Sequence, residues 1–216
     1  MAVLVGVAMF LAEWLREERT RVLIDFMRAH SFAALAGGDE LAMSHVPLLV
    51  EEGVAGLRLH GHFARANPHW RHLRDGAEVL AAFMGPNAYV SPRCYRAPDV
   101  PTWNYGVVQA RGRWRREADE EAIGRHLEAI VDHYESFEPV PWSLAEIDPA
   151  IPAAFRKGVI VFSIEVTELK GALKLSQDKD VAQQAGVADF LHERGRPADI
   201  ALAELMRNSM GDVKND

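Results

Sequence analysis

Residues 54–70 read VAGLRLHGHFARANPHW, a pattern in which a strand runs directly into the start of a helix. Apolar or small residues alternate with polar ones along it, which places Arg58, His60 and His62 together on one face. Asn67-Pro68 then marks a helix start, since asparagine caps helices and proline suits the first helical position. The stretch therefore predicts a strand with one apolar and one polar face, followed by a short helix.

The same alternation, interrupted by turn signals, recurs on both sides of this stretch. It predicts six strands, at residues 31–36, 41–50, 54–63, 78–83, 103–114 and 158–169. The first three read as a β-meander. Apolar residues at helical spacing predict helices at residues 13–29, 119–135, 179–194 and 197–208. Hairpin-linked strands favour an antiparallel barrel over a parallel α/β sheet, so the fold class is mainly β (α+β) with flanking helices.

Composition limits the functions that this chain can have. Its 216 residues carry a net charge of −7, which favours solubility and argues against a surface that coats DNA. The single cysteine, Cys94, excludes an intrachain disulfide and favours a reducing, cytoplasmic location. The uncharged run at residues 2–12 is too short to cross a bilayer, so no membrane association is expected.

Residues 60–105 concentrate aromatic, amide, hydroxyl, imidazole and guanidinium groups, a mixture typical of a pocket for a flat, polar, anionic ligand such as FMN. The helix start at Asn67, with Arg65 and Arg71 beside it, could hold a phosphate. A capped surface helix with solvated arginines is the alternative. His60 and His62, two apart on one strand, are interpreted as hydrogen-bonding groups, because two histidines are too few for a metal site, and His45 is interpreted in the same way. The histidines at 30, 69, 72, 126, 133 and 192 are expected on helical or exposed surfaces.

A second group of candidates follows in the proline-rich part of this region. Tyr89 could border an aromatic ring and Ser91 could donate to a phosphate, although a barrel edge closed by a tyrosine is an equally simple interpretation. On the next strand Thr102 and Asn104 face one side while Trp103 faces the other, which suggests a lined cavity. The basic run at residues 111–116 is followed by acidic residues that offset it, so a solvated strand end is favoured over a DNA contact.

Five motifs occur in order along the chain: SHVPLL (44–49), GHFARANPHW (61–70), PNAYVSPRCY (86–95), VPTWNY (100–105) and KLSQ (174–177). With them the chain resembles the PaiB-type family, described as FMN-binding negative transcriptional regulators. That family belongs to the split-barrel flavoproteins related to pyridoxamine phosphate oxidases. One departure is Asp178, which stands where the family typically has asparagine.

The resemblance implies an FMN-binding split β-barrel of about six antiparallel strands at residues 31–178, between helical segments at 1–30 and 179–216. It also implies a homodimer with FMN at the interface, and DNA as a partner by resemblance only. The cofactor-binding residues then expected are His45, His62, Arg65, Asn67, Trp70, Arg71, Tyr89, Ser91, Thr102, Trp103, Asn104, Lys174 and Gln177.

Three functions remain open from the sequence: a flavin-binding regulator, an FMN-dependent oxidoreductase or flavin reductase that uses the same pocket, and a barrel that binds haem or another small molecule. No catalytic side chain and no metal ligand is predicted, because a flavin carries the chemistry and the protein only positions it.

Overall fold

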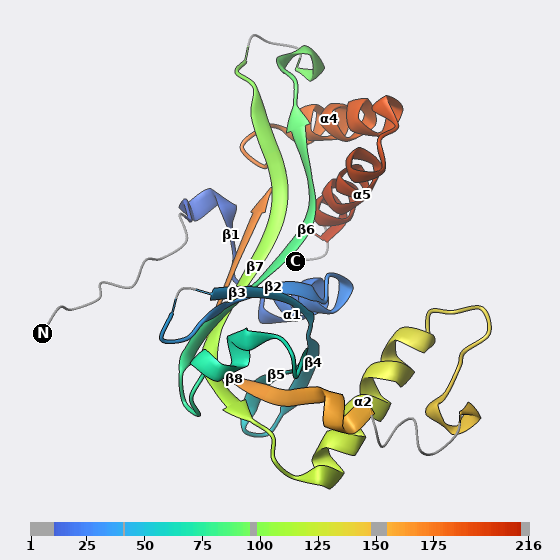
Figure 1. The fold of residues 1–216 in the computed structure, drawn as a ribbon. Coiled ribbons are helices and arrows are strands. Elements are labelled where there is room, and N and C mark those ends of the chain that lie inside the picture. Colours follow the sequence, from blue (N-terminus) through green and yellow to red (C-terminus); the bar gives the residue numbers. More distant parts are fainter. Residues whose placement is uncertain (1–10, 41, 96–98, 148–154, 213–216) are drawn as a thin grey trace, which may run out of the picture. The chain divides into compact units, whose positions relative to one another are not determined.

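The computed structural model describes residues 11–40, 42–95, 99–147 and 155–212 (Figure 1). Most of the uncharged run at residues 2–12 lies outside these ranges. The strands are β1 (Arg16–Glu17), β2 (Phe32–Gly37), β3 (Ala42–Pro47), β4 (Leu49–Gly53), β5 (Gly56–Ala64), β6 (Glu78–Val90), β7 (Thr102–Arg116) and β8 (Val159–Lys174). The α-helices include α1 (Thr20–Ala29), α2 (Glu120–Glu135), α4 (Val181–Arg194) and α5 (Pro197–Asp212), and the short 3-10 helices include η2 (Pro68–His72) and η3 (Pro92–Cys94).

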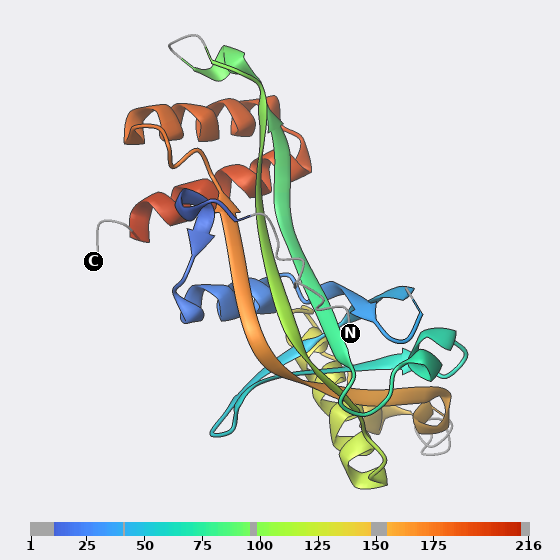
Figure 2. The same ribbon diagram turned by 90° about the vertical axis from the view of Figure 1, so that its left-hand side faces the viewer.

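The strands form one sheet in the order β3-β2-β6-β7-β8-β5-β4, and β1 pairs with β8. The pairs β2–β3, β2–β6, β4–β5 and β5–β8 are all antiparallel. The long strands β6, β7 and β8 are neighbours in this order and can be followed in Figures 1 and 2. The predicted antiparallel, mainly β architecture with flanking helices is therefore confirmed. The sheet does not close, since its end strands β3 and β4 are not paired with each other.

The predicted β-meander is wrong, because the run at residues 41–50 is two strands rather than one. β3 pairs with β2 and β4 pairs with β5, so the two strands stand at opposite ends of the sheet although only Leu48 separates them. Leu48 is buried, and a Cβ on Gly61 of β5 would lie 2.7 Å from its Cδ2 and 3.2 Å from the carbonyl oxygen of Pro47. The two ends of the sheet approach each other here because residue 61 has no side chain.

The predicted helix at residues 13–29 begins only at Thr20. Residues before it pair with β8 instead, with Arg16 opposite Ala172 and Glu17 opposite Gly171. The Glu17 carboxylate accepts a hydrogen bond from the Arg19 backbone N–H at 2.8 Å, next to the start of α1. Sheet pairing therefore outweighs the helical pattern of the side chains in this segment. The structure has two strands more than the six predicted, and β1 is one of them. The divided run at 41–50 explains the other.

The chain divides into two compact units, and the long strands β6, β7 and β8 each contribute residues to both units. Unit 1 comprises Met1–Leu23, Met84–Val108 and Lys170–Asp216, and unit 2 comprises Ile24–Phe83 and Gln109–Leu169. The core of unit 2 contains Phe63, Phe162 and Trp114, with ring centroids of the successive pairs 4.8 and 6.0 Å apart. The predicted boundaries at residues 30 and 178 stay a prediction.

Unit 1 contains the helical hairpin of α4 and α5, which lie side by side in Figure 2. Gly195 ends α4 in a left-handed conformation (φ 74°), as expected for a C-terminal cap. Across this turn the Arg194 guanidinium binds the buried Asp199 carboxylate through two hydrogen bonds of 2.6 and 2.7 Å. Arg194 also donates to the carbonyl of Tyr89 at 3.0 Å, which attaches the hairpin to β6.

Candidate functional site

The residues predicted to bind a cofactor fall into two groups, one in each compact unit. Unit 2 holds His45, His62, Arg65, Asn67, Trp70 and Arg71, and unit 1 holds Tyr89, Ser91, Thr102, Trp103, Asn104, Lys174 and Gln177. Each group has its own geometry and is described separately.

An aromatic pair at the surface dominates the group in unit 1. The rings of Tyr89 and Trp103 lie 6.4 Å apart at an interplanar angle of 71°, and their residues are 42% and 55% exposed. Tyr89 is near the end of β6, where Arg194 holds its carbonyl, and Trp103 is at the start of β7. At this angle one of the two exposed rings can stack on a planar ligand while the other borders the edge of that ligand.

A half-buried cation lies in the same unit. The Lys174 ammonium group at the end of β8 donates to the hydroxyl of Thr102. In the described ranges Lys174 has no carboxylate partner, so its charge is available to an anionic or electron-rich ligand. Ser91, in contrast, is used locally, because its hydroxyl caps the short helix η3 by accepting from the Arg93 N–H.

The KLSQ segment forms a tightly held turn after β8. The Gln177 side chain accepts from the Leu175 N–H at 2.6 Å and donates to the Trp14 carbonyl at 2.9 Å. Ser176 is buried and has φ 63°, a left-handed conformation that a non-glycine residue rarely adopts. Such a conformation persists only where surrounding contacts hold it, which is common next to functional sites.

Asn104 supplies one of those contacts. It is completely buried (0% exposed), and its amide nitrogen donates to the Ser176 hydroxyl at 2.9 Å. Its carbonyl oxygen is buried without a hydrogen-bond partner in the described residues. Asn104 and Trp103 therefore point to opposite sides of β7, as the strand alternation predicts. Because Asn104 is buried and bonded to Ser176, it lies beneath the KLSQ turn and not at an open surface.

In unit 2, Asn67 caps a helix as predicted, but its side chain is fully engaged by the protein. Its amide oxygen accepts from the His69 N–H at 3.0 Å and its amide nitrogen donates to the Ser44 hydroxyl at 3.0 Å. The buried His69 ring donates through Nε2 to the Gly37 carbonyl at 3.1 Å, and its Nδ1 lies 2.9 Å from Ser44 Oγ. This network attaches the short helix η2 to β2 and β3.

Arg65 and Trp70 form a second set of contacts beside this helix. The Arg65 guanidinium donates to the carbonyls of Lys157 (2.5 Å) and Val159 (3.2 Å). The Trp70 indole N–H donates to the Arg65 carbonyl at 3.0 Å. The guanidinium carbon of Arg71 lies 5.1 Å from the centroid of the same indole, a cation–π arrangement.

His62 lies against His126 of α2, a contact that the sequence did not indicate. His62 Nδ1 and His126 Nε2 are 3.1 Å apart, so one ring donates to the other. Burial lowers the pKa of His62, and burial together with the charges of His62 and His60 lowers the pKa of His126 to about 4. The expectation that His69 and His126 are at the surface is wrong: both are buried, because β3 and β5 offer them hydrogen-bond partners.

His45 is exposed on the outer side of β3, and its ring stacks on that of Phe32 with centroids 6.2 Å apart. Cys94 is a poor nucleophile candidate: burial raises the pKa of its thiol, which donates to the Ser91 carbonyl. In the ranges that the structure describes, no three or more His, Cys, Asp or Glu side chains are grouped to hold a metal ion.

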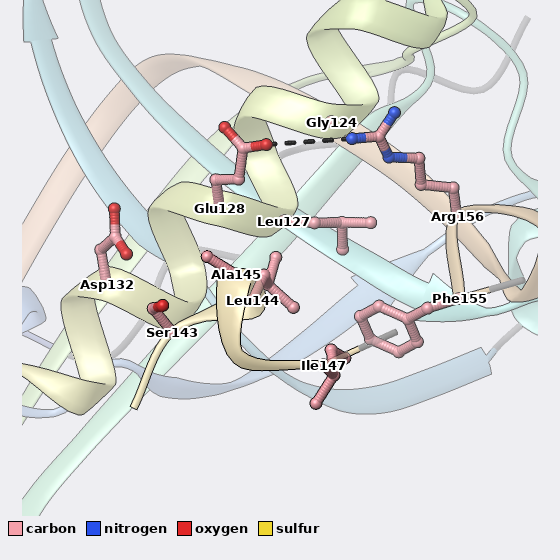
Figure 3. Close-up of a pocket in the computed structure, with 10 residues that line it drawn as sticks. All are labelled: Gly124, Leu127, Glu128, Asp132, Ser143, Leu144, Ala145, Ile147, Phe155 and Arg156. Carbon is pink, nitrogen blue, oxygen red and sulfur yellow. Dashed lines mark ion pairs between the residues drawn. The ribbon is translucent and has the colours of Figure 1, made fainter. Parts of the chain in front are cut away.

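Two cavities lie in unit 2, and none of the predicted cofactor-binding residues lines either of them. One, of about 510 Å³, is lined by α2 and by residues 143–147 and 155–156 (Figure 3). Leu127, Leu144 and Phe155 supply apolar surface there, while Glu128 pairs with Arg156 at 3.8 Å. The other, of about 850 Å³, is bounded by β4, β5 and α2 and includes His60 and His126 in its wall. Sequence patterns missed both, because each combines residues distant along the chain.

The side chains present fit the chemistry of FMN. The isoalloxazine ring needs an aromatic surface and hydrogen-bonding groups, which Tyr89, Trp103 and Thr102 offer in unit 1. The phosphate needs a cation without an acidic partner, and Lys174 in the same unit meets that requirement among the described residues. The buried and engaged side chains of Asn104, Asn67 and Gln177 fit better as supports than as direct contacts.

The fold and the side chains that can contact a ligand are those of a split-barrel protein of the flavin-binding class. Solved structures with a similar fold agree with this. The flavocytochrome Anf3 from Azotobacter vinelandii has a TM-score of 0.61 at 14% identity, covering 81% of this chain and 78% of that one. An FAD- and haem-binding protein from Mycobacterium smegmatis has a TM-score of 0.57 at 16% identity, covering 79% and 78%. Identities this low support the fold alone.

The family follows from sequence. The profile described as "Putative FMN-binding domain" matches residues 9–168, so the chain belongs to this family and FMN is its cofactor. A relative from Bacillus subtilis, "Protease synthase and sporulation protein PAI 2", is 27% identical over 205 residues, which cover 94% of this chain and 98% of the relative. A protein from Aspergillus fumigatus is 26% identical over 194 residues, covering 73% and 74%. The resemblance to the PaiB-type family is confirmed.

Proposed function

We propose that this FMN-binding protein acts as a PaiB-like negative regulator of transcription in the cytoplasm. The observation that carries the proposal is the match to the Bacillus subtilis relative, which extends over nearly the whole of both chains. Bound FMN would supply a group whose redox state changes with metabolism. The single free cysteine suits a reducing compartment, and no helix in the described residues is long and apolar enough to span a membrane.

We further propose that the working form is a homodimer with FMN at the interface. Exposed apolar side chains support this. On the outer side of β2 and β3, Phe32 and Met43 are 67% and 62% exposed and flank His45, and in unit 1 Trp103 and Tyr89 are open to solvent. Apolar surface of this kind marks interaction sites. Size-exclusion chromatography with light scattering tests the dimer, and a monomer in both apo and FMN-loaded samples contradicts it.

The regulatory function is tested by gel retardation of genomic fragments at physiological salt, with and without FMN. Specific retardation that changes with FMN is expected. A visible spectrum of the purified protein comes first, because flavin absorption establishes the cofactor independently of DNA. Flavin bands without any specific retardation would leave FMN binding intact and contradict the regulatory function.

A second candidate is an FMN-dependent oxidoreductase or flavin reductase. The exposure of the Tyr89–Trp103 pair favours it, because an open aromatic surface leaves room for a second planar molecule beside a bound flavin. FMN-dependent oxidation of NADH or NADPH that falls on Trp103→Ala replacement would support this activity. An equal rate with free FMN alone would contradict it.

A further inference from the structure

The cavity of about 510 Å³ in unit 2 has a lining that is separate from the residues expected to hold FMN (Figure 3). Its volume lies in the range of pockets for small organic molecules, roughly 300–1,000 Å³. One wall is a single face of α2, because Gly124, Leu127, Glu128 and Asp132 follow each other at helical spacing. Residues 143–147 and 155–156 form the rest of the lining. The cavity can therefore receive a ligand of its own.

Apolar side chains form the middle of this cavity. Leu127 is 2% exposed and belongs to the hydrophobic core of unit 2, so this part of the wall is firmly held. Leu144 and Ile147 lie across from it in Figure 3. Phe155 is 45% exposed, which leaves a large part of its ring in water. An apolar molecule placed here would remove that surface from water, and this favours binding.

The charges of the lining are distributed unequally between its two ends. At one end the Arg156 guanidinium rests against the backbone of α2, since a Cβ on Gly124 would lie 3.0 Å from Arg156 Nη2. The same nitrogen lies 3.8 Å from the Glu128 carboxylate. Asp132 lies at the other end, beside Ser143 (Figure 3), about 12 Å along the helix from Gly124. In the part of the chain that the structure describes, Asp132 has no ion-pair partner, so this end of the cavity is negatively charged.

Two further carboxylates belong to the segments that carry Asp132 and Ser143. Glu135 accepts a hydrogen bond from the Trp142 backbone N–H at 2.8 Å, and Glu146 accepts one from the Ser143 N–H at 2.8 Å. Both acids therefore bind backbone donors and keep their negative charge near this end of the cavity. Carboxylates gathered beside an apolar wall raise the local concentration of cations.

A molecule with a cationic head and an apolar body complements this arrangement. Its ammonium group would pair with Asp132, and its aromatic or alkyl body would cover Leu127, Leu144 and Phe155. An anionic head would be repelled by the same carboxylate, and a wholly polar molecule would gain nothing from the apolar wall. We propose that this cavity binds a lipophilic ammonium compound and that Asp132 selects its positive charge. This binding goes beyond the proposed regulatory function and does not rest on it.

Three probes that share one apolar body separate the effect of charge from that of hydrophobicity. Phenylbutylamine carries a cation at neutral pH, phenylbutanol is neutral, and phenylbutyrate carries an anion. Isothermal titration calorimetry measures the binding of each probe to the full-length, FMN-loaded protein. The amine is expected to bind most tightly, the alcohol about fivefold more weakly, and the carboxylate more weakly than the alcohol.

Variants locate the binding in the cavity. D132N keeps the shape of the side chain and is expected to weaken the amine about fivefold while leaving the alcohol within twofold. E138Q removes the same charge from an exposed position that does not line the cavity, and it should leave both within twofold. R156Q removes the partner of Glu128 and should tighten the amine but not the alcohol. A145W places a large ring in the wall at an exposed position and should weaken all three probes.

Equal affinity of wild type for the amine and the alcohol, or no binding of either in the millimolar range, refutes the proposal. Equal effects of D132N and E138Q also refute it, because the general charge of the surface would then explain the preference. Unchanged binding of all probes to A145W places them outside the cavity. Competition between FMN and the amine for the apo protein would make the cavity part of the flavin site and would contradict a separate site. Gel retardation has no bearing on these outcomes, so a failure of the regulatory function is recognised independently.

Discussion

Replacing His126 by glutamine should remove a large part of the acid sensitivity of this protein between pH 8 and pH 5. His126 is buried on α2, 3.1 Å from His62, and burial with the neighbouring His62 and His60 lowers its pKa to about 4. In the unfolded chain the imidazole titrates near pH 6.5. The unfolded state therefore binds more protons than the folded state across this window, and stability falls as the pH falls.

Proton linkage gives the size of the effect. A shift from about 6.5 to about 4 costs about 2 kcal/mol of folding free energy at pH 5 and about 3 kcal/mol at pH 4, relative to pH 8. The lowered pKa of His62 acts in the same direction. Most carboxylates stay ionised down to about pH 5, so the window from pH 8 to pH 5 reports mainly on histidines.

Urea unfolding of full-length wild type, His126→Gln and His192→Gln at several pH values measures this. His192 is exposed on α4 and serves as the matched control. Wild type and His192→Gln are expected to lose more than about 2 kcal/mol between pH 8 and pH 5, and His126→Gln clearly less. A slope of His126→Gln equal to that of wild type, or a wild-type protein that gains stability on acidification, would refute the reasoning.

Three other perturbations test separate parts of the structure. Gly61→Ala should cost about 1–3 kcal/mol of stability in urea unfolding, because its Cβ would lie 2.7 Å from Leu48 Cδ2; an unchanged midpoint would contradict the close approach of the sheet ends. Arg65→Ala should lower the melting temperature, since its guanidinium holds the carbonyls of Lys157 and Val159 at the start of β8; a loss of FMN at unchanged stability would instead give Arg65 a ligand-binding role. Lys174→Met should weaken FMN binding about tenfold in fluorescence titration with little change in melting temperature. If the variant binds FMN as tightly as wild type, Lys174 does not contact the cofactor.

The architecture was largely predictable because strand alternation and turn signals are local properties of the chain. The strand at β5, the capped turn at Asn67 and the helices α2, α4 and α5 all occur where the pattern predicts them. The errors arose where pairing between distant segments decides the structure. Leu48 separates two strands at opposite ends of the sheet, and Glu17 joins β8 instead of extending α1. Neither choice leaves a signal in the local sequence.

The candidate site illustrates the same limit at the level of side chains. Sequence identifies which residues can bind a flavin phosphate, but not whether the protein already uses their hydrogen bonds. Asn67 and Arg65 have the right chemistry, yet their polar groups are engaged with Ser44, His69 and backbone carbonyls.

Arg116 showed no ligand signal in the sequence, because the acidic residues after it were expected to neutralise the basic run. In the structure Glu117 and Asp119 cap backbone N–H groups, and the guanidinium carbon of Arg116 lies 5.4 Å from the centroid of the Trp70 ring. The charge that stays available for a ligand is therefore decided by which partners the fold has already supplied.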